Sequence, residues 1–104
     1  MWKNSTQKDG IIIELHFSWK YLLVYYTFNM KIANDLAETG KKYLDSGNYN
    51  NALSFFDQAL SLEPTNPDFW NLKGMALRSL GRYDEATDCY NKSLEIEPRD
   101  KQSS

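Results

Sequence analysis

A fixed spacing of 34 residues relates the two halves of residues 33–98, and this spacing constrains the fold more than any other feature of the sequence. Both halves carry glycine, tyrosine, alanine, aromatic, leucine and proline residues at the same relative positions. The matched pairs are Gly40 and Gly74, Gly47 and Gly81, Tyr49 and Tyr83, Ala52 and Ala86, Phe56 and Tyr90, Leu60 and Leu94, and Pro64 and Pro98. A period of this length is typical of a repeated helix–turn–helix unit.

Helical spacing within each unit supports this interpretation. In the second unit one stripe runs through Trp70, Gly74 and Leu77, and another through Tyr83, Ala86, Tyr90 and Leu94. Gly81 can end a helix in the left-handed conformation, and Asn66 before Pro67 is suited to cap the start of one. The sequence therefore predicts an all-α fold of antiparallel hairpins, with helices at about 33–46, 49–62, 68–80 and 83–96.

The repeated pattern resembles the tetratricopeptide repeat (TPR) family. In the first unit the matching residues are Leu36, Gly40, Tyr43, Gly47, Tyr49, Ala52, Phe56, Ala59 and Pro64. In the second they are Trp70, Gly74, Leu77, Gly81, Tyr83, Ala86, Tyr90 and Pro98, while Ser93 stands where the family prefers alanine. The resemblance implies a superhelical array of two repeats, 33–66 and 67–98, followed by a C-terminal tail, 99–104.

By the same resemblance, the first helix of each repeat lines a concave side that binds a protein or peptide partner. The implied partner-binding residues are Asn34, Ala37, Lys41, Leu44, Asp68, Asn71, Met75 and Arg78. The alternative is a structural assembly part that self-associates through uncapped repeat ends, because repeat arrays need polar capping elements. The residues expected at such an end are Leu80, Leu94 and Ile96.

Some TPR proteins hold the acidic C-terminal tails of chaperones in a clamp of Lys, Asn and Arg side chains, and this sequence departs from that clamp. Ala37 and Lys41 stand where the first helix of the clamp presents Lys and Asn, and Leu72 occupies the second repeat's Asn position. We therefore expect the groove to prefer a peptide with an apolar anchor near Met75 and Leu44 and only modest negative charge.

Composition argues against an enzyme and against a nucleic-acid-binding protein. His16 is the only histidine and has no recognisable nucleophile partner, so we expect no catalytic residues, no cofactor and no metal site. Residues 33–104 carry 8 Lys and Arg against 12 Asp and Glu, which disfavours binding to a phosphate backbone. Cys89 is the only cysteine and is expected to be a small packing residue.

The N-terminal segment, residues 1–32, is harder to interpret. Residues 1–10 are polar and aperiodic, which predicts a flexible start. From Ile13 to Tyr21 apolar and polar residues alternate as in a strand, although a helical stripe also exists. A packed cap on the repeats, a membrane or interface anchor through residues 11–28, and a segment outside the native folded unit all stay open. The expected location is cytoplasmic, or membrane-associated if residues 11–28 form an anchor.

Overall fold

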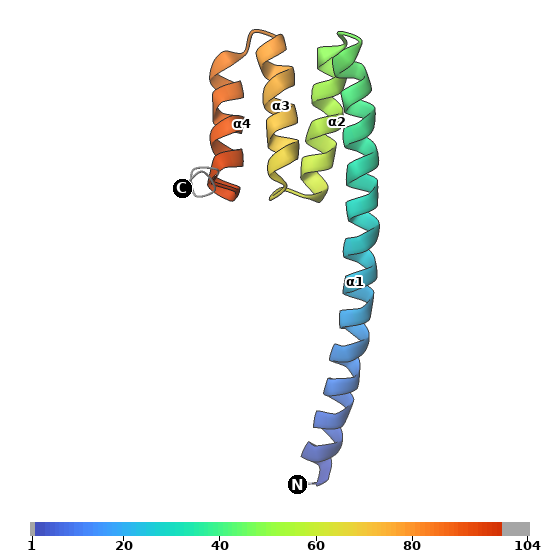
Figure 1. Cartoon of the computed structure of the whole chain (residues 1–104). Coiled ribbons are helices and arrows are strands. Elements are labelled where there is room, and N and C mark those ends of the chain that lie inside the picture. Colours follow the sequence, from blue (N-terminus) through green and yellow to red (C-terminus); the bar gives the residue numbers. More distant parts are fainter. Residues whose placement is uncertain (1, 99–104) are drawn as a thin grey trace.

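Four α-helices make up the part of the chain that the structure describes. The computed structural model describes the backbone of residues 2–98 and the side chains from Lys20 to Pro98; the predicted tail, 99–104, lies outside the described residues. The helices are α1 (Trp2–Asp45), α2 (Tyr49–Leu62), α3 (Pro67–Ser79) and α4 (Tyr83–Ile96). They form two antiparallel hairpins that stand side by side (Figure 1). The all-α prediction is confirmed, and apart from the start of α1 every predicted helix end lies within one residue of the observed one.

Glycine conformation and one asparagine cap define the turns. Gly47 and Gly81 have φ angles of 86° and 80°, which a residue with a side chain rarely adopts, so each ends the first helix of its hairpin. The Asn66 side-chain oxygen accepts hydrogen bonds from the backbone N–H groups of Asp68 and Phe69, at 3.0 and 3.3 Å. By contrast, Asn48 makes no side-chain cap hydrogen bond to α2, and its amide group donates to the Ser46 hydroxyl.

Each hairpin closes through an aromatic ring placed against a glycine of its first helix. A Cβ atom added to Gly40 would lie 2.6 Å from the Phe56 ring, and one added to Gly74 would lie 2.6 Å from the Tyr90 ring. Such distances are too short for real contacts, so only glycine lets the paired helices approach this closely. The two positions differ in burial, since Phe56 is fully buried and Tyr90 is half-buried.

The two hairpins pack through a core that runs across α1, α2 and α3. Leu60 of α2 and Phe69 of α3 belong to one buried cluster, together with Ala33, Ala37 and Ala59. A second cluster joins Ala52, Phe56 and Ala76. At the edge of this interface, Lys73 of α3 lies 2.8 Å from the Asp57 carboxylate of α2. Because both side chains are partly exposed, this ion pair contributes at most about 1 kcal/mol, and the apolar clusters hold the repeats together.

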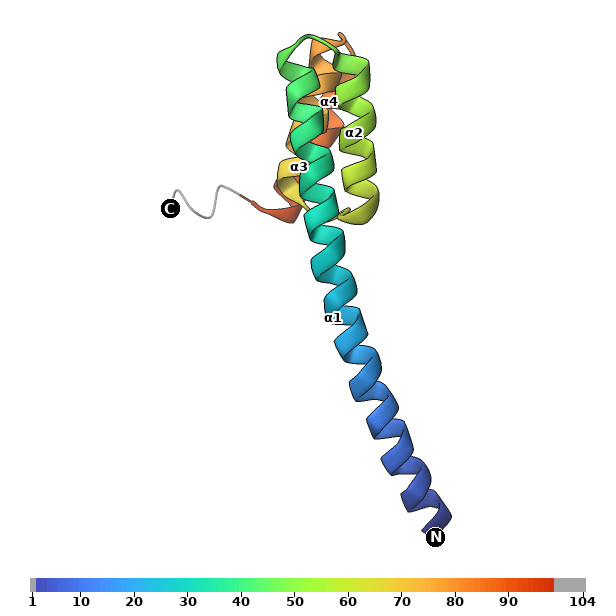
Figure 2. The same cartoon turned by 90° about the vertical axis from the view of Figure 1, so that its right-hand side faces the viewer.

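The N-terminal segment is helical from Trp2 onward, so the strand interpretation of residues 13–21 is wrong. α1 is one continuous helix of 44 residues whose first half projects beyond the hairpins (Figures 1 and 2). A lone strand would leave its backbone N–H and C=O groups without partners, and no other strand lies among residues 2–98 to supply them. Extending a helix that the first repeat has already nucleated satisfies each group locally.

Alanine substitutions at Gly40 and Gly74 test the ring-against-glycine contact. Helix propensity alone favours alanine by about 1 kcal/mol at both sites. Since Phe56 is fully buried and cannot swing away, we expect Gly40→Ala to lower the free energy of unfolding by about 1–3 kcal/mol. Tyr90 is half-buried and can move toward solvent, so Gly74→Ala should cost less. Urea unfolding of both variants checks the order, and equal costs at the two sites would contradict this explanation.

The repeats should fold without the projecting part of α1. Every fully buried apolar residue of the described side chains lies between Ala33 and Cys89, so the clusters that hold the hairpins together do not include residues 20–32. We expect a chain of residues 30–104 to keep a helical circular dichroism spectrum and a cooperative thermal transition. A random-coil spectrum would show that the leading segment is required for folding.

Candidate functional site

The residues predicted to bind a partner fall into two groups of repeat-equivalent positions on α1 and α3. The exposed members are Asn34, Lys41, Asp68, Met75 and Arg78, and the half-buried members are Leu44 and Asn71. Ala37 is only 3% exposed and belongs to the cluster that joins the repeats, so its inclusion in a binding surface was wrong. Leu44 also packs against a core cluster and presents only part of its side chain.

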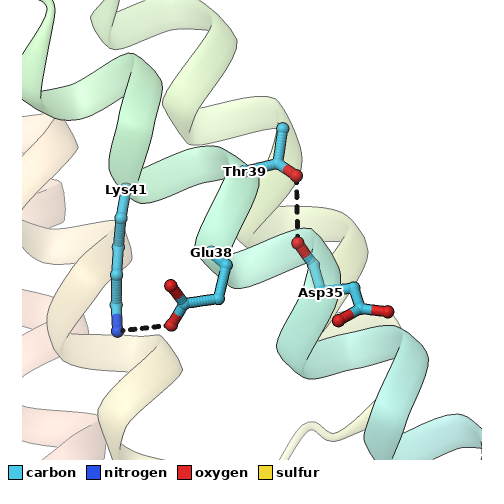
Figure 3. A network of polar contacts seen from close by, with 4 residues as sticks. All are labelled: Asp35, Glu38, Thr39 and Lys41. Carbon is cyan, nitrogen blue, oxygen red and sulfur yellow. Dashed lines mark hydrogen bonds and ion pairs between the residues drawn. The ribbon is translucent and has the colours of Figure 1, made fainter.

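Lys41 is already engaged within α1. Its ammonium group donates a hydrogen bond to the Glu38 carboxylate one turn away, at 3.2 Å (Figure 3). On the same stretch of helix, the Thr39 hydroxyl donates to the backbone oxygen of Asp35 at 3.0 Å. Both members of the ion pair are exposed, so the pair is weak, but it offsets the positive charge that Lys41 would offer an acidic ligand.

Met75 is an apolar side chain left open to solvent on the candidate surface. It is 46% exposed, and with Arg78, Ser79 and Tyr90 it lines a hollow of about 190 Å³. Methionine adapts its shape to different apolar groups, which suits a binding surface. The sequence placed Tyr90 on a helical stripe, at the same repeat position as the buried Phe56, and not among the partner-binding residues. Only the arrangement of neighbouring helices distinguishes the two aromatic residues.

The residues expected at an uncapped repeat end are covered to different degrees. Leu94 on α4 is 47% exposed, whereas Leu80 and Ile96 are half-buried. Leu94 is therefore the most accessible of the three. Its side chain lies on the same stripe of α4 as Tyr83 and Tyr90, because residues spaced by seven and eleven fall on one helical face.

The projecting part of α1 carries another apolar surface, which we call the α1 segment (residues 21–30). Eight of its ten side chains are large, apolar and between 48% and 67% exposed. Five of them line a hollow of about 660 Å³: Tyr21, Leu22, Val24, Tyr25 and Phe28. Sequence reasoning left open a membrane anchor here. Within residues 2–98, no helix combines the length and the hydropathy that a membrane span requires.

Among the described residues three ionisable groups have perturbed pKa values, and two of them, Glu85 and Cys89, line a hollow of about 430 Å³ along α3 and α4. Arg82 donates to both carboxylate oxygens of Glu85, at 2.6 and 2.8 Å, which lowers the pKa of Glu85 and raises that of Arg82. This pair is fully exposed. Burial raises the pKa of the Cys89 thiol, which keeps it protonated. Among the described residues, no three His, Cys, Asp or Glu side chains lie close enough to hold a metal ion.

Stacked helical hairpins with accessible side chains on their first helices define a helical-repeat scaffold. The sequence signature of the tetratricopeptide repeat matches residues 33–66 and, a second time, residues 67–100. The chain therefore belongs to the tetratricopeptide repeat family.

Similar proteins agree with this assignment. An uncharacterized protein of Methanocaldococcus jannaschii is 38% identical over 69 residues, which are 66% of this chain and 80% of that protein. Hsp70-Hsp90 organizing protein 2 of Arabidopsis thaliana is 33% identical over 67 residues, which span 64% of this chain but 12% of the larger protein. The crystal structure of MamA protein shares the fold, with a TM-score of 0.60 and 24% identity over 67% of this chain and 38% of that one. The family assignment supports a protein–protein interaction module.

The reactivity of Cys89 should report on opening of the second hairpin. Its side chain is 4% exposed among Leu77 and Ala86, and its pKa is raised by burial, so little thiolate is present or accessible at mildly alkaline pH. We expect alkylation by iodoacetamide to be far slower in the folded chain than in urea. Mass spectrometry measures the alkylation rate in each state. Equal rates in the folded chain and in urea would show that α3 and α4 do not shield the thiol.

Proposed function

We propose that this protein captures a peptide from a partner protein on the surface formed by the first helices of its two repeats, α1 and α3. The observation that carries the proposal is the open hollow at the edge of this surface, which the exposed Met75 lines together with Arg78 and Ser79 of α3 and Tyr90 of α4. A peptide needs one apolar side chain to anchor in this hollow and polar groups to pair along the rest of the surface.

The charges along this surface favour a peptide of low net charge. Arg78 is a free-standing positive group beside the hollow, since no ion pair is found for it among the described residues. Asp68 on the same helix carries the opposite charge, and the positive charge of Lys41 is offset by Glu38. An apolar anchor next to a single acidic residue, which can approach Arg78, fits this arrangement.

Capture of strongly acidic chaperone tails fits less well, although relatives named as Hsp70-Hsp90 organizing proteins contain similar repeats. Ala37 stands at the clamp's lysine position but is buried, so even a lysine there would have to displace the core. Leu72, at the clamp's asparagine position, packs against the clusters of both repeats. The repeat interface therefore uses two positions that a clamp would need for its polar side chains.

Substitution of Met75 tests the proposed anchor. A random-peptide phage library would be selected on the immobilised full chain, and a selected peptide would be labelled and titrated by fluorescence anisotropy. We expect Met75→Glu to weaken binding by about tenfold or more, because it places a charge at the apolar anchor. Asn51→Glu, at an exposed position of α2, is the control and should leave the affinity unchanged. Equal binding to both variants would place the peptide elsewhere.

A second titration tests discrimination against acidic tails. The probe is a labelled peptide that ends in several acidic residues and a free carboxylate. We expect no saturable binding at micromolar protein, since Lys41 is paired and the clamp positions are apolar. Micromolar binding that disappears in Lys41→Ala and at moderate salt, but persists in the neighbouring Lys42→Ala, would show that α1 and α3 form an acidic-peptide clamp after all.

A further inference from the structure

Exposed large apolar side chains gather on two separate surfaces of this molecule. Eleven such residues are found among residues 20–98, and eight of them lie in the α1 segment. The other three are Met75 on α3 and Tyr83 and Leu94 on α4. Single exposed apolar residues are ordinary, but a contiguous group such as the α1 segment marks an interaction surface.

Comparison of equivalent positions in the two repeats explains why apolar side chains of α4 are exposed. Leu60 and Leu94 occupy equivalent positions 34 residues apart, yet Leu60 is 6% exposed and Leu94 is 47% exposed. Leu60 is covered because it shares a buried cluster with Phe69 of the next helix, α3. The same relation holds for Phe56, which is fully buried with Ala76 of α3, and Tyr90, which is half-buried.

The face of α4 that carries Tyr83, Tyr90 and Leu94, together with Met75 of α3, is therefore a stacking surface, which we call the end face. In the first hairpin, the equivalent positions of α2 form the surface against which α3 packs. By continuity with that interface, the occupant that fits the end face is a helix that presents a large apolar side chain in the role of Phe69.

We propose that the end face of one copy is occupied by the α1 segment of a second copy. The segment is already helical, and its side chains are large, apolar and uncovered. It cannot reach the end face of its own chain, because α1 is one continuous helix that leads away from α4 (Figures 1 and 2). This contact borders the α1–α3 peptide site at Met75, but the observations that support it do not depend on peptide capture.

Charge and length match across the proposed contact. The α1 segment itself carries no charged side chain and is flanked by Lys20 and Lys31. On α4, Asp84 and Glu95 have the same separation of eleven residues, about 16 Å along a helix. An antiparallel arrangement, as between helices of a hairpin, brings each lysine near one of these carboxylates. Glu95 lies 3.9 Å from Lys92, a weak pair that leaves its carboxylate open to a second cation.

The available area is sufficient for a specific complex. Half-exposed aromatic and aliphatic side chains of this size each present on the order of 100 Å². In a reciprocal dimer, each copy places its α1 segment on the end face of the other, so the contact is formed twice. Such a reciprocal pair can reach the roughly 1,200–2,000 Å² of total buried area that stable interfaces have.

Two variants, one for each side of the contact, test the proposal in the full-length chain. The segment variant is Tyr25→Glu with Phe28→Glu, and the end-face variant is Leu94→Glu. All three positions are exposed, so circular dichroism should be unchanged. By sedimentation equilibrium we expect the parent to self-associate and each variant alone to associate about tenfold more weakly or worse. Asn51→Glu should behave as the parent.

Mixing the two variants gives the decisive result. The end-face variant keeps an intact segment and the segment variant keeps an intact end face, so an equimolar mixture should form a one-to-one complex that neither forms alone. A parent that stays monomeric at high concentration overturns the proposal. It is also overturned if Leu94→Glu associates like the parent while the segment variant does not, because the segments then pair with each other. A monomeric parent that sediments with phosphatidylcholine–phosphatidylserine vesicles through its segment shows a lipid-binding helix instead.

Discussion

The contact between a glycine of the first helix and an aromatic ring of the second sets the geometry of each hairpin. With no Cβ at Gly40, the backbone of α1 comes close enough for the edge of the Phe56 ring to fill the crossing point. Gly74 and Tyr90 repeat the arrangement in α3 and α4. Once the distance between the two helices of a hairpin is fixed, the positions of the turn glycine, the small alanines and the next hairpin follow from it.

Stacking then decides what each hairpin exposes. Each repeat packs only against the repeats next to it in the chain. The burial of a side chain therefore depends on whether a neighbouring helix packs over it. The pairs Leu60 and Leu94, and Phe56 and Tyr90, are nearly the same chemically but differ in exposure. Within the described residues the second hairpin exposes positions that α3 covers in the first hairpin, and this is why we propose that its exposed apolar residues form a stacking surface.

This dependence also separates what the sequence could predict from what it could not. Turn glycines and the Asn66 cap are local signals, and the 34-residue register repeats them in both hairpins. The ends of α2, α3 and α4 were therefore predicted within one residue. The burial of Ala37 was missed because it arises from packing against the next repeat, which a surface assignment by helical position does not include. The strand-like alternation before residue 22 was misread because a local period says nothing about whether partner strands exist.

The two proposed interactions share a border, and this has a thermodynamic consequence. Met75 belongs to both surfaces, Arg78 to the surface of α1 and α3 and Tyr90 to the end face, and all three line one small hollow. A peptide side chain in that hollow and an α1 segment lying over Tyr90 require the same space. Binding at one site must therefore weaken the other by the same factor, since coupling between binding equilibria is reciprocal. Self-association would keep the peptide site closed in the absence of a partner, and a partner that binds at Met75 would release the monomer.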